Sequence, residues 1–338
     1  MASRRIRSRS IANPPVPPPT EEATAEFRTH DFQLAPELAG LRIDQALARA
    51  LPQYSRGRIQ GWIEAGAVQV EGRVPRGRDK VLGGERVRIQ AQLEGEQGVE
   101  AESLPLDIVY EDRSLLVINK PPGLVVHPGA GNARHTLQNA LLAFDSKLSL
   151  VPRAGIVHRL DKDTSGLLVV ARTPEAHTAL VAALAAREVG REYLAICTGV
   201  MTSGGTINEP IGRHRTLRTR MTTRPDGREA VTHFRILQRF NAHTYVRVQL
   251  ETGRTHQIRV HLSYIGFPIV GDPVYGGRRR VPAGCGPELE EKINAFGRQA
   301  LHATRLKLEH PDTGLEVHWE VPPPADFKHL LKTLAADE

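Results

Sequence analysis

The chain has 338 residues, 40% of them hydrophobic and 25% charged, which is enough for about two domains with buried cores. This composition excludes collagen-like, disulfide-rich and fully disordered chains, and the formal net charge of +7 favours an anionic partner such as nucleic acid. The cysteines, Cys197 and Cys285, are too few for a disulfide framework or a thiolate zinc site, which fits a reducing cytoplasm. No apolar run reaches the roughly 18 residues that span a membrane.

Residues 1–26 hold four arginines followed by PPVPPP and predict a disordered, basic, proline-rich tail. Residues 41–51 then show the apolar spacing of a helix. A second helix follows, with Ser55 as its cap and Gly66 as its left-handed terminator. VQVEGRV and GERVRIQ alternate in the manner of strands, and the first of them turns at Glu71-Gly72.

This small unit carries a cluster of basic side chains, namely Arg56, Arg58, Arg73, Arg76, Arg78 and Lys80. Such a cluster predicts a surface that follows phosphates, the alternative being an ordinary solvated charged face. The order of a helix, an SRGRI helix and a VQVEG hairpin resembles the S4 RNA-binding domain over residues 41–90. The resemblance implies a small S4-like α/β RNA-binding domain in which Arg56, Arg58 and Arg73 bind RNA.

Residues 91–103 are rich in Glu and Gly and predict a flexible acidic linker at the domain boundary. LDIVYED and SLLVINK follow as predicted strands. The glycine-rich PPGLVVHPGAG is not a phosphate loop, because no Gly-Lys-Ser/Thr follows it, and we expect turns there instead.

The stretch HRLDKDTSGLLVVAR, residues 158–172, contains the strongest candidate for a catalytic side chain. GIVHRL predicts a short buried strand, DKDTSG a polar turn and LLVVA a second buried strand. Asp161 is therefore expected where a core strand ends, a common place for catalytic carboxylates because the strand fixes the backbone while the loop exposes the side chain. The alternative is a turn aspartate that hydrogen-bonds its own backbone, a description that suits Asp163 better.

The remaining patterns predict an α+β fold. Thr173 and Pro174 open a helix, and in the strand REYLAICTG the side chains of Tyr193, Ala195 and Cys197 share one face. AVTHFRIL, TYVRVQL, LHATRLKLEHP and LEVHWEVPPP are further short strands, which favours a largely antiparallel sheet flanked by a few helices. Residues 278–299 are expected to form a surface excursion.

GRTHQIRVHLSYIG predicts a helix that Thr255 caps and Gly266 ends. On this helix Arg259 lies about one turn beyond His256. His256 and His261 are five residues apart and point in different directions, and no carboxylate is near them in sequence, so we expect no metal site.

HRLDKDTSGLLVVA, REYLA, GRTHQIRVHL, GDPVYGG and LHA are similar, in order and spacing, to the pseudouridine synthases that share an HRLD motif, which include the large-subunit rRNA enzymes. The match covers residues 104–324. It implies a catalytic domain over residues 104–330 with a mainly antiparallel mixed sheet, and an isomerase without a cofactor. In this reaction the glycosidic C–N bond of uridine is cleaved, the uracil turns, and C5 is rejoined to the same ribose.

The resemblance also implies the site residues. Glycoside hydrolysis needs two carboxylates, whereas an isomerisation that returns its base can use one. The HRLD motif makes Asp161 that carboxylate, as a nucleophile at C1′ or a base at C2′. The QIR motif makes Arg259 its partner, since a guanidinium favours the ionised carboxylate. Tyr193, from the REY motif, is expected to stack on uracil and to serve in proton transfer at C5, the alternative being an ordinary core tyrosine.

The implied substrate is ribosomal RNA. The target nucleotide must leave its stack, and Arg159 is expected to fill the space left behind. Single-stranded loops make this least costly, and the most similar members modify the 23S rRNA stem-loop that faces the decoding site. We expect that target, in free large-subunit rRNA or the pre-ribosomal large subunit, and a cytoplasmic monomer. Two alternatives are a non-catalytic RNA-binding ribosome-assembly factor and a nucleosidase that releases uracil.

Overall fold

The chain forms two compact units. The computed structural model describes residues 26–51, 54, 56–93, 99–129, 132, 134–217, 219–276 and 286–337. One unit comprises Met1–Gly98 with Lys147–Pro152, and the other comprises Val99–Ser146 with Arg153–Glu338. The predicted tail over residues 1–26 lies outside the described residues except for its last position.

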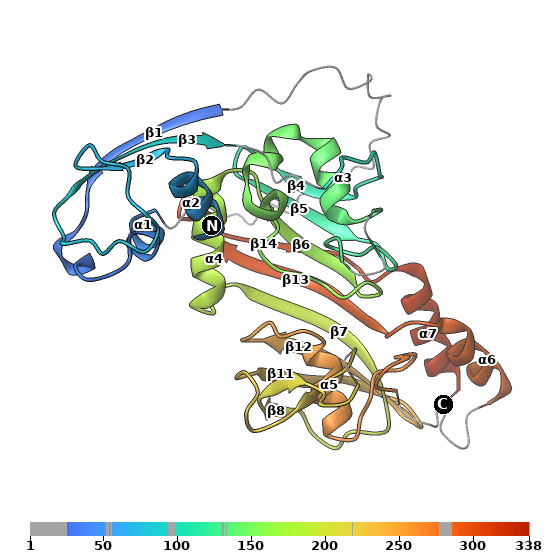
Figure 1. Ribbon diagram of the computed structural model, residues 1–338. Coiled ribbons are helices and arrows are strands. Elements are labelled where there is room, and N and C mark those ends of the chain that lie inside the picture. Colours follow the sequence, from blue (N-terminus) through green and yellow to red (C-terminus); the bar gives the residue numbers. More distant parts are fainter. Residues whose placement is uncertain are drawn as a thin grey trace. The chain divides into compact units, whose positions relative to one another are not determined.

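The N-terminal unit combines two short helices with a three-stranded antiparallel sheet of order β1-β3-β2 (Figure 1). Its elements are β1 (Glu26–Gln33), the 3-10 turn η1 (Pro36–Leu38), α1 (Ile43–Ala50), α2 (Arg56–Glu64), β2 (Val68–Val70) and β3 (Arg86–Leu93). Leu47, Ile59 and Ile89 are fully buried in a core that the helices share with the sheet. The predicted helices and strands are confirmed, and Glu71 and Gly72 have the positive φ angles of the predicted turn.

Strand β1 extends this unit beyond the expected residues 41–90. It pairs with β3 from Glu26 opposite Leu93 to Gln33 opposite Arg86. The expected linker at residues 91–103 therefore begins inside a strand. Its far end is also fixed, because the Glu102 amide donates to the Asn139 carbonyl at 3.0 Å and the Asn139 side chain donates to the Glu100 carbonyl at 2.7 Å. Residues 94–98 lie outside the described part of the chain.

The C-terminal unit is built on one large mixed sheet, whose main path is β4-β5-β6-β13-β7-β12-β11-β8, with β14 paired to β13. The strands are β4 (Ile108–Glu111), β5 (Leu115–Lys120), β6 (Ser165–Ala171), β7 (Gly190–Thr198), β8 (Gly205–Asn208), β11 (Val231–Arg239), β12 (His243–Leu250), β13 (Leu301–Glu309) and β14 (Glu316–Glu320); β9 (Ile211–Arg213) and β10 (Met221–Thr223) form a separate pair. Every described strand pairing is antiparallel except that of β6 with β13. This confirms the predicted α+β fold with a mainly antiparallel mixed sheet.

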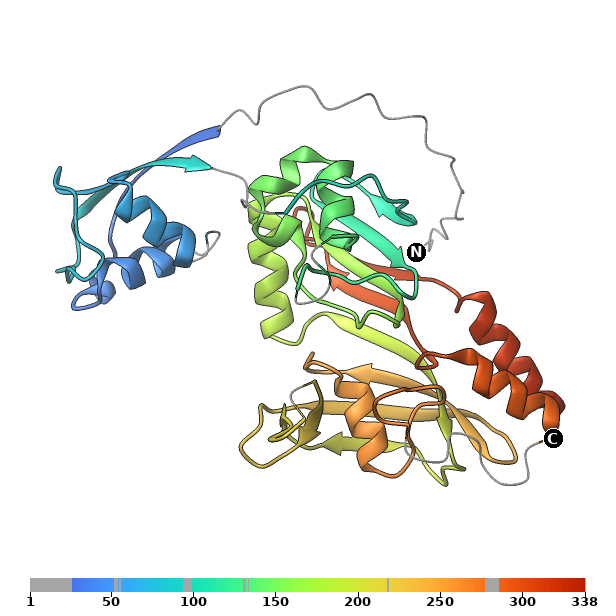
Figure 2. The same cartoon turned by 45° about the vertical axis from the view of Figure 1, so that its right-hand side comes forward.

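Short helices surround this sheet (Figure 2). They are α3 (Leu137–Phe144), η3 (Pro152–Gly155), α4 (Pro174–Ala185), α5 (Gln257–Tyr264), α6 (Pro287–Phe296) and α7 (Ala325–Ala336). The 3-10 turn η2 (Ser146–Leu150) belongs, except for Ser146, to the N-terminal unit. As predicted, α4 starts with Pro174, and the Thr173 hydroxyl accepts a hydrogen bond from the Ala176 amide at 3.1 Å. Leu180 of this helix is buried in a core with Val117 of β5 and Val169 of β6. None of the described helices has the length and apolar character needed to cross a membrane.

Two expected segments differ from the structure. GIVHRL is not a strand, because only Ile156 forms a bridge, to Val170. The chain enters this segment through Arg153 and Ala154, which both have left-handed backbone angles, and it pairs with β6 only at the Ile156–Val170 bridge. The expected excursion at residues 278–299 contains α6, which packs beside α7 (Figure 2); residues 277–285 lie outside the described chain.

Candidate active site

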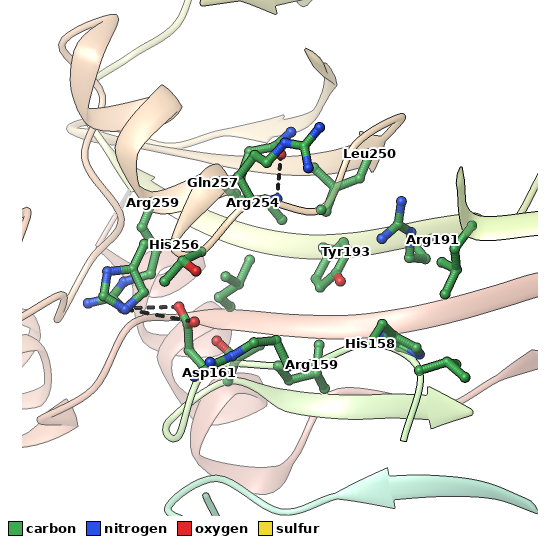
Figure 3. A pocket seen from close by; sticks show the side chains of 18 of the residues that line it. His158, Arg159, Asp161, Arg191, Tyr193, Leu250, Arg254, His256, Gln257 and Arg259 are labelled. Atoms are coloured by element: carbon green, nitrogen blue, oxygen red, sulfur yellow. Dashed lines mark hydrogen bonds and ion pairs between the residues drawn. The ribbon is translucent and has the colours of Figure 1, made fainter. Parts of the chain in front are cut away.

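A pocket of about 360 Å³ in the C-terminal unit brings four predicted residues together: Asp161, Arg159, Tyr193 and Arg259 all line it (Figure 3). They come from three elements that are distant in sequence, namely the turn before β6, strand β7 and helix α5. The volume is within the range of small-molecule sites, so the pocket has room for one nucleoside.

Asp161 lies in a turn whose backbone carbonyls are held by two buried cations, Lys120 and Arg298. The Thr164 amide donates to the Asp161 carbonyl at 3.1 Å. The ammonium of Lys120 donates to the Lys162 carbonyl at 2.8 Å, and the guanidinium of Arg298 donates to the Asp163 carbonyl at 3.1 Å. Because these donors satisfy the turn through its carbonyls, the carboxylate of Asp161 is left to face the pocket.

Lys120 is among the largest fully buried side chains of the C-terminal unit. Its ammonium donates to three carbonyls, those of Pro121, Leu124 and Lys162, at 2.8–2.9 Å. Burial lowers the pKa of Lys120 to about 7, against the attraction of Asp163 and Asp161. Sequence reasoning did not single out this lysine, which fastens the end of β5 to the turn that carries Asp161.

Arg259 connects two carboxylates. Its Nη1 donates to Asp161 Oδ2 at 3.0 Å, and its Nε and Nη2 donate to the two oxygens of Asp272 at 2.7 and 2.9 Å. Burial acts to lower the pKa of Arg259, but the hydrogen bonds and charges of Asp272 and Asp161 raise it above its ordinary value. The guanidinium therefore stays charged and pairs with the carboxylate of Asp161 across 3.0 Å.

Asp272 was missed by sequence reasoning, although it belongs to the GDPVYGG motif. It is 2% exposed, and its Oδ1 also accepts hydrogen bonds from the amides of Val274 and Tyr275, both at 2.9 Å. The ring of Tyr275 lies 5.0 Å below the guanidinium of Arg259. This loop thus fixes the plane of the guanidinium from the side opposite Asp161.

Helix α5 begins differently from the prediction. His256, not Thr255, is its N-cap, with the left-handed angles φ 57° and ψ 20°. Gln257 secures this strained start, since its side chain accepts from the hydroxyl of Thr252 at 2.8 Å and donates to the carbonyl of Val231 at 3.0 Å. The conformation brings Nε2 of His256 to 3.9 Å from Asp161 Oδ1.

Tyr193 is 5% exposed, yet its ring lines the pocket from β7 (Figure 3). Burial raises the pKa of Tyr193, with the charge of Arg191 opposing the shift, so the hydroxyl keeps its proton. Beside Asp161, the side chain of Arg159 is exposed at the pocket. His158 is an anchor instead, because its Nε2 accepts from the Val169 amide at 3.2 Å, and burial lowers its pKa to about 3.

The predicted RNA-binding residues of the N-terminal unit, Arg56, Arg58 and Arg73, differ in their exposure and in their contacts. Arg73 is exposed next to the turn after β2. Arg58 is partly engaged, because its Nη1 donates to the Leu150 carbonyl at 3.1 Å within the same unit. The side chain of Arg56 lies outside the described residues. Within the described chain, no cluster of three or more His, Cys, Asp or Glu side chains is arranged to hold a metal ion.

Comparisons with known proteins define the class. A family model described as RNA pseudouridylate synthase matches residues 114–264, and the S4 domain model matches residues 41–87. The chain is similar to two human solved structures, RNA Pseudouridylate Synthase Domain Containing 1 and 4, at 29% identity each. Their TM-scores are 0.51 and 0.53, with 65% and 68% of this chain and 84% and 92% of those chains covered.

More similar relatives cover nearly the whole chain. It is 55% identical to ribosomal large subunit pseudouridine synthase D of Salmonella typhimurium over 299 residues, and 54% identical to that of Escherichia coli K12. Both matches span 88% of this chain and 92% of the relative. The protein of the same name from Pseudomonas aeruginosa is 55% identical over 301 residues, which are 89% of this chain and 94% of the relative. The chain therefore belongs to the family of RNA pseudouridine synthases, isomerases that convert uridine in RNA to pseudouridine, and it carries an S4 domain.

Proposed function

We propose that this enzyme isomerises specific uridines of large-subunit 23S rRNA, in the stem-loop facing the decoding site, with Asp161 as its single catalytic carboxylate. One observation carries the catalytic assignment: Asp161 is the only Asp or Glu among the described residues that line the pocket. The large-subunit substrate is inferred from the relatives, which are ribosomal large subunit pseudouridine synthases. The charge of +7 suits an RNA partner.

The geometry suits attack on the ribose. Asp161 Oδ2 is held by Arg259 at 3.0 Å, while Oδ1 faces His256 at 3.9 Å, which is beyond hydrogen-bond distance. This oxygen is free to act as a nucleophile at C1′ or as a base at C2′. As the N1–C1′ bond breaks, uracil leaves as a delocalised anion, and Asp161 either forms an ester bond to C1′ or takes the C2′ proton. When the C5–C1′ bond forms, that ester bond breaks or the C2′ proton is returned. The C5 proton is lost and N1 gains a proton, so atoms balance without water or cofactor.

Tyr193 and Arg159 support the base and the RNA in this proposal. The ring of Tyr193 stacks on the uracil, and its hydroxyl relays the proton of C5, releasing its own proton as it accepts the one that C5 loses. Because the target nucleotide is flipped out of its stack, the exposed guanidinium of Arg159 fills the space left behind. Arg56, Arg58 and Arg73 of the N-terminal unit bind flanking RNA phosphates, and the enzyme acts as a monomer in the cytoplasm.

One assay tests the activity, the target and the catalytic residue. The purified enzyme is incubated with 23S rRNA fragments that carry tritium at uridine C5, and released tritium, free uracil and carbodiimide-detected pseudouridine are measured. We expect tritium release and pseudouridine in the decoding-site stem-loop, and no free uracil. Asp161→Asn should lower the rate at least about 10⁴-fold, because it removes the reacting group, whereas Asp163→Asn should retain most of it.

Each alternative gives a different result in this assay. Free uracil would indicate a nucleosidase, and RNA binding without tritium release from any fragment would indicate an assembly factor without catalysis. Full activity of Asp161→Asn would show that another residue is the catalytic carboxylate.

A further inference from the structure

Arg191 is a buried cation in the active-site pocket for which the reaction just described has no use. It precedes Tyr193 by two residues on β7, so both side chains project from the same face of the strand (Figure 3). It is 7% exposed and lines the same pocket as Asp161.

The buried charge of the Arg191 guanidinium is balanced by few contacts. Its Nη2 donates to the Glu251 carbonyl at a long 3.3 Å, and its buried Nε has no hydrogen-bond partner among the described residues. Arg259, the other buried arginine of the pocket, is held by two carboxylates. A buried charge without a partner costs free energy, so the fold keeps Arg191 in a state that an incoming anion would stabilise.

The surroundings of Arg191 are open toward an anion. A β-carbon at Gly253 would lie 2.7 Å from Arg191 Nη1, so any side chain at that position would cover the guanidinium. The charge of Arg191 adds to burial in lowering the pKa of His158, which leaves this neighbour uncharged. The pocket lining is basic overall, with one carboxylate against the arginines Arg153, Arg159, Arg191, Arg254 and Arg259.

We propose that Arg191 is a phosphate-binding residue, whose guanidinium binds the backbone phosphate next to the target uridine while the uracil lies on Tyr193. Arginine suits this task because its planar fork matches phosphate oxygens. Residues two apart on one strand face are separated by roughly 7 Å, so the base and a neighbouring phosphate of one nucleotide are both within reach. The inference rests on the proposed position of the uridine beside Asp161 and Tyr193.

The test compares RNAs that differ in one backbone charge. One is an rRNA fragment that the wild-type enzyme modifies. The others each carry one neutral methylphosphonate, at the linkage 5′ of the target uridine, at the linkage 3′ of it or, as the control, three linkages away. We expect the wild-type kcat/KM, measured by tritium release, to fall about 10- to 100-fold at one adjacent linkage, the range for losing charge-assisted hydrogen bonds, and to change little for the control.

The variants assign this effect to Arg191. Arg191→Gln should lower kcat/KM on the unmodified RNA about 10- to 100-fold, with no further decrease on the methylphosphonate RNA. Gly253→Ala should have a similar effect, because its β-carbon covers Nη1 of Arg191. Arg153→Gln, which changes another arginine of the lining, should keep the wild-type discrimination between the two RNAs. Because each variant is compared with itself on two RNAs, a general loss of folded enzyme cancels.

Two results would overturn the proposal. One is a wild-type enzyme that does not distinguish either adjacent methylphosphonate from phosphate. The other is an Arg191→Gln enzyme that still distinguishes them as the wild type does, which would leave Arg191 a purely structural residue. The RNA pair is built on whichever fragment the wild-type enzyme modifies, so a wrong rRNA target and a wrong role for Arg191 give different results.

Discussion

The carboxylate of Asp161 shares one guanidinium with a second carboxylate, that of Asp272, which is more deeply buried. Asp272→Asn keeps the shape of the side chain but removes its charge and one acceptor for Arg259. We expect kcat to fall about 10- to 100-fold with a small change in KM, because Arg259 loses the hydrogen bonds that fix it against Asp161. Single-turnover tritium release at saturating RNA measures this effect.

The matched control for this prediction is Asp312→Asn. Asp312 also pairs with an arginine, Arg113, at 2.9 Å, but on the surface and outside the pocket. Its replacement should leave kcat unchanged, since exposed ion pairs contribute little. Equal kcat values for Asp272→Asn and the wild type would show that Arg259 is held sufficiently by other contacts.

Sequence reasoning found four of the residues that line the pocket, Asp161, Arg159, Tyr193 and Arg259, and missed Arg191 and the residues that hold the site from outside the pocket. Asp161, Tyr193 and Arg259 are found because each belongs to a motif whose spacing resembles a known family. Asp272 and Lys120 make their contacts across the fold, over 13 residues to Arg259 and 42 residues to Lys162, and no local pattern predicts such pairs. GDPVYGG was a usable signal for Asp272, because it is one of the matched motifs and contains a single acidic residue.

At the scale of elements, the turn that carries Asp161 depends on a glycine. Gly166, at the start of β6, has φ +111°, and a β-carbon there would collide with the Ala303 carbonyl of β13, the strand that pairs with β6 in parallel. Gly166→Ala should therefore lower the free energy of unfolding by more than about 3 kcal/mol, combining backbone strain with a steric clash. Urea denaturation followed by circular dichroism measures it.

Gly123→Ala separates strain from clash in this experiment. Gly123 also has a positive φ, of +86°, but nothing lies within 4 Å of the added β-carbon. We expect a loss of about 1–2 kcal/mol from backbone strain alone. If both variants lost the same free energy, the close approach of β6 to β13 would be irrelevant to stability.

Elements with a strong local pattern were predictable, and elements made by distant pairing were not. The strands LLVVA and REYLAICTG and the Thr173-Pro174 helix start are all confirmed. β1 was missed because its sequence EFRTHDFQ is largely polar and its pairing partner is about sixty residues away. Helix α7 was missed although Phe327, Leu330 and Leu334 are spaced as one helix face and are buried, so its periodicity was a usable signal.

At the scale of the whole molecule, the two-unit organisation follows from the sequence, but one boundary does not. Lys147–Pro152 lies inside the stretch expected for the catalytic domain, yet it belongs to the N-terminal unit. Leu150 packs against the core of that unit, and its carbonyl accepts the hydrogen bond of Arg58. The sequence of a short apolar stretch does not indicate which core will bury it. Lys147–Pro152 was therefore predicted to belong to the same domain as the residues on either side of it.

Acid stability is also a property of the whole molecule, because histidines are buried in several parts of it. Burial lowers the pKa to about 4 in His127, His243 and His302 and to about 3 in His158. Between these values and about 6.5 the unfolded chain binds more protons than the native state, so stability rises with pH and is lost as pH falls below about 6.5. We expect the urea midpoint to decrease steeply from pH 6.5 to pH 4.5.

His243 allows this explanation to be tested at one site. It is fully buried, and neither ring nitrogen has a hydrogen-bond partner among the described residues. His243→Leu removes an unsatisfied polar group and its titration, so we expect a small gain in unfolding free energy at pH 7 and a larger gain at pH 5. The slope against pH should decrease by up to about 1.4 kcal/mol per pH unit, the contribution of one proton. An unchanged slope would mean that other groups, chiefly carboxylates, govern the acid unfolding.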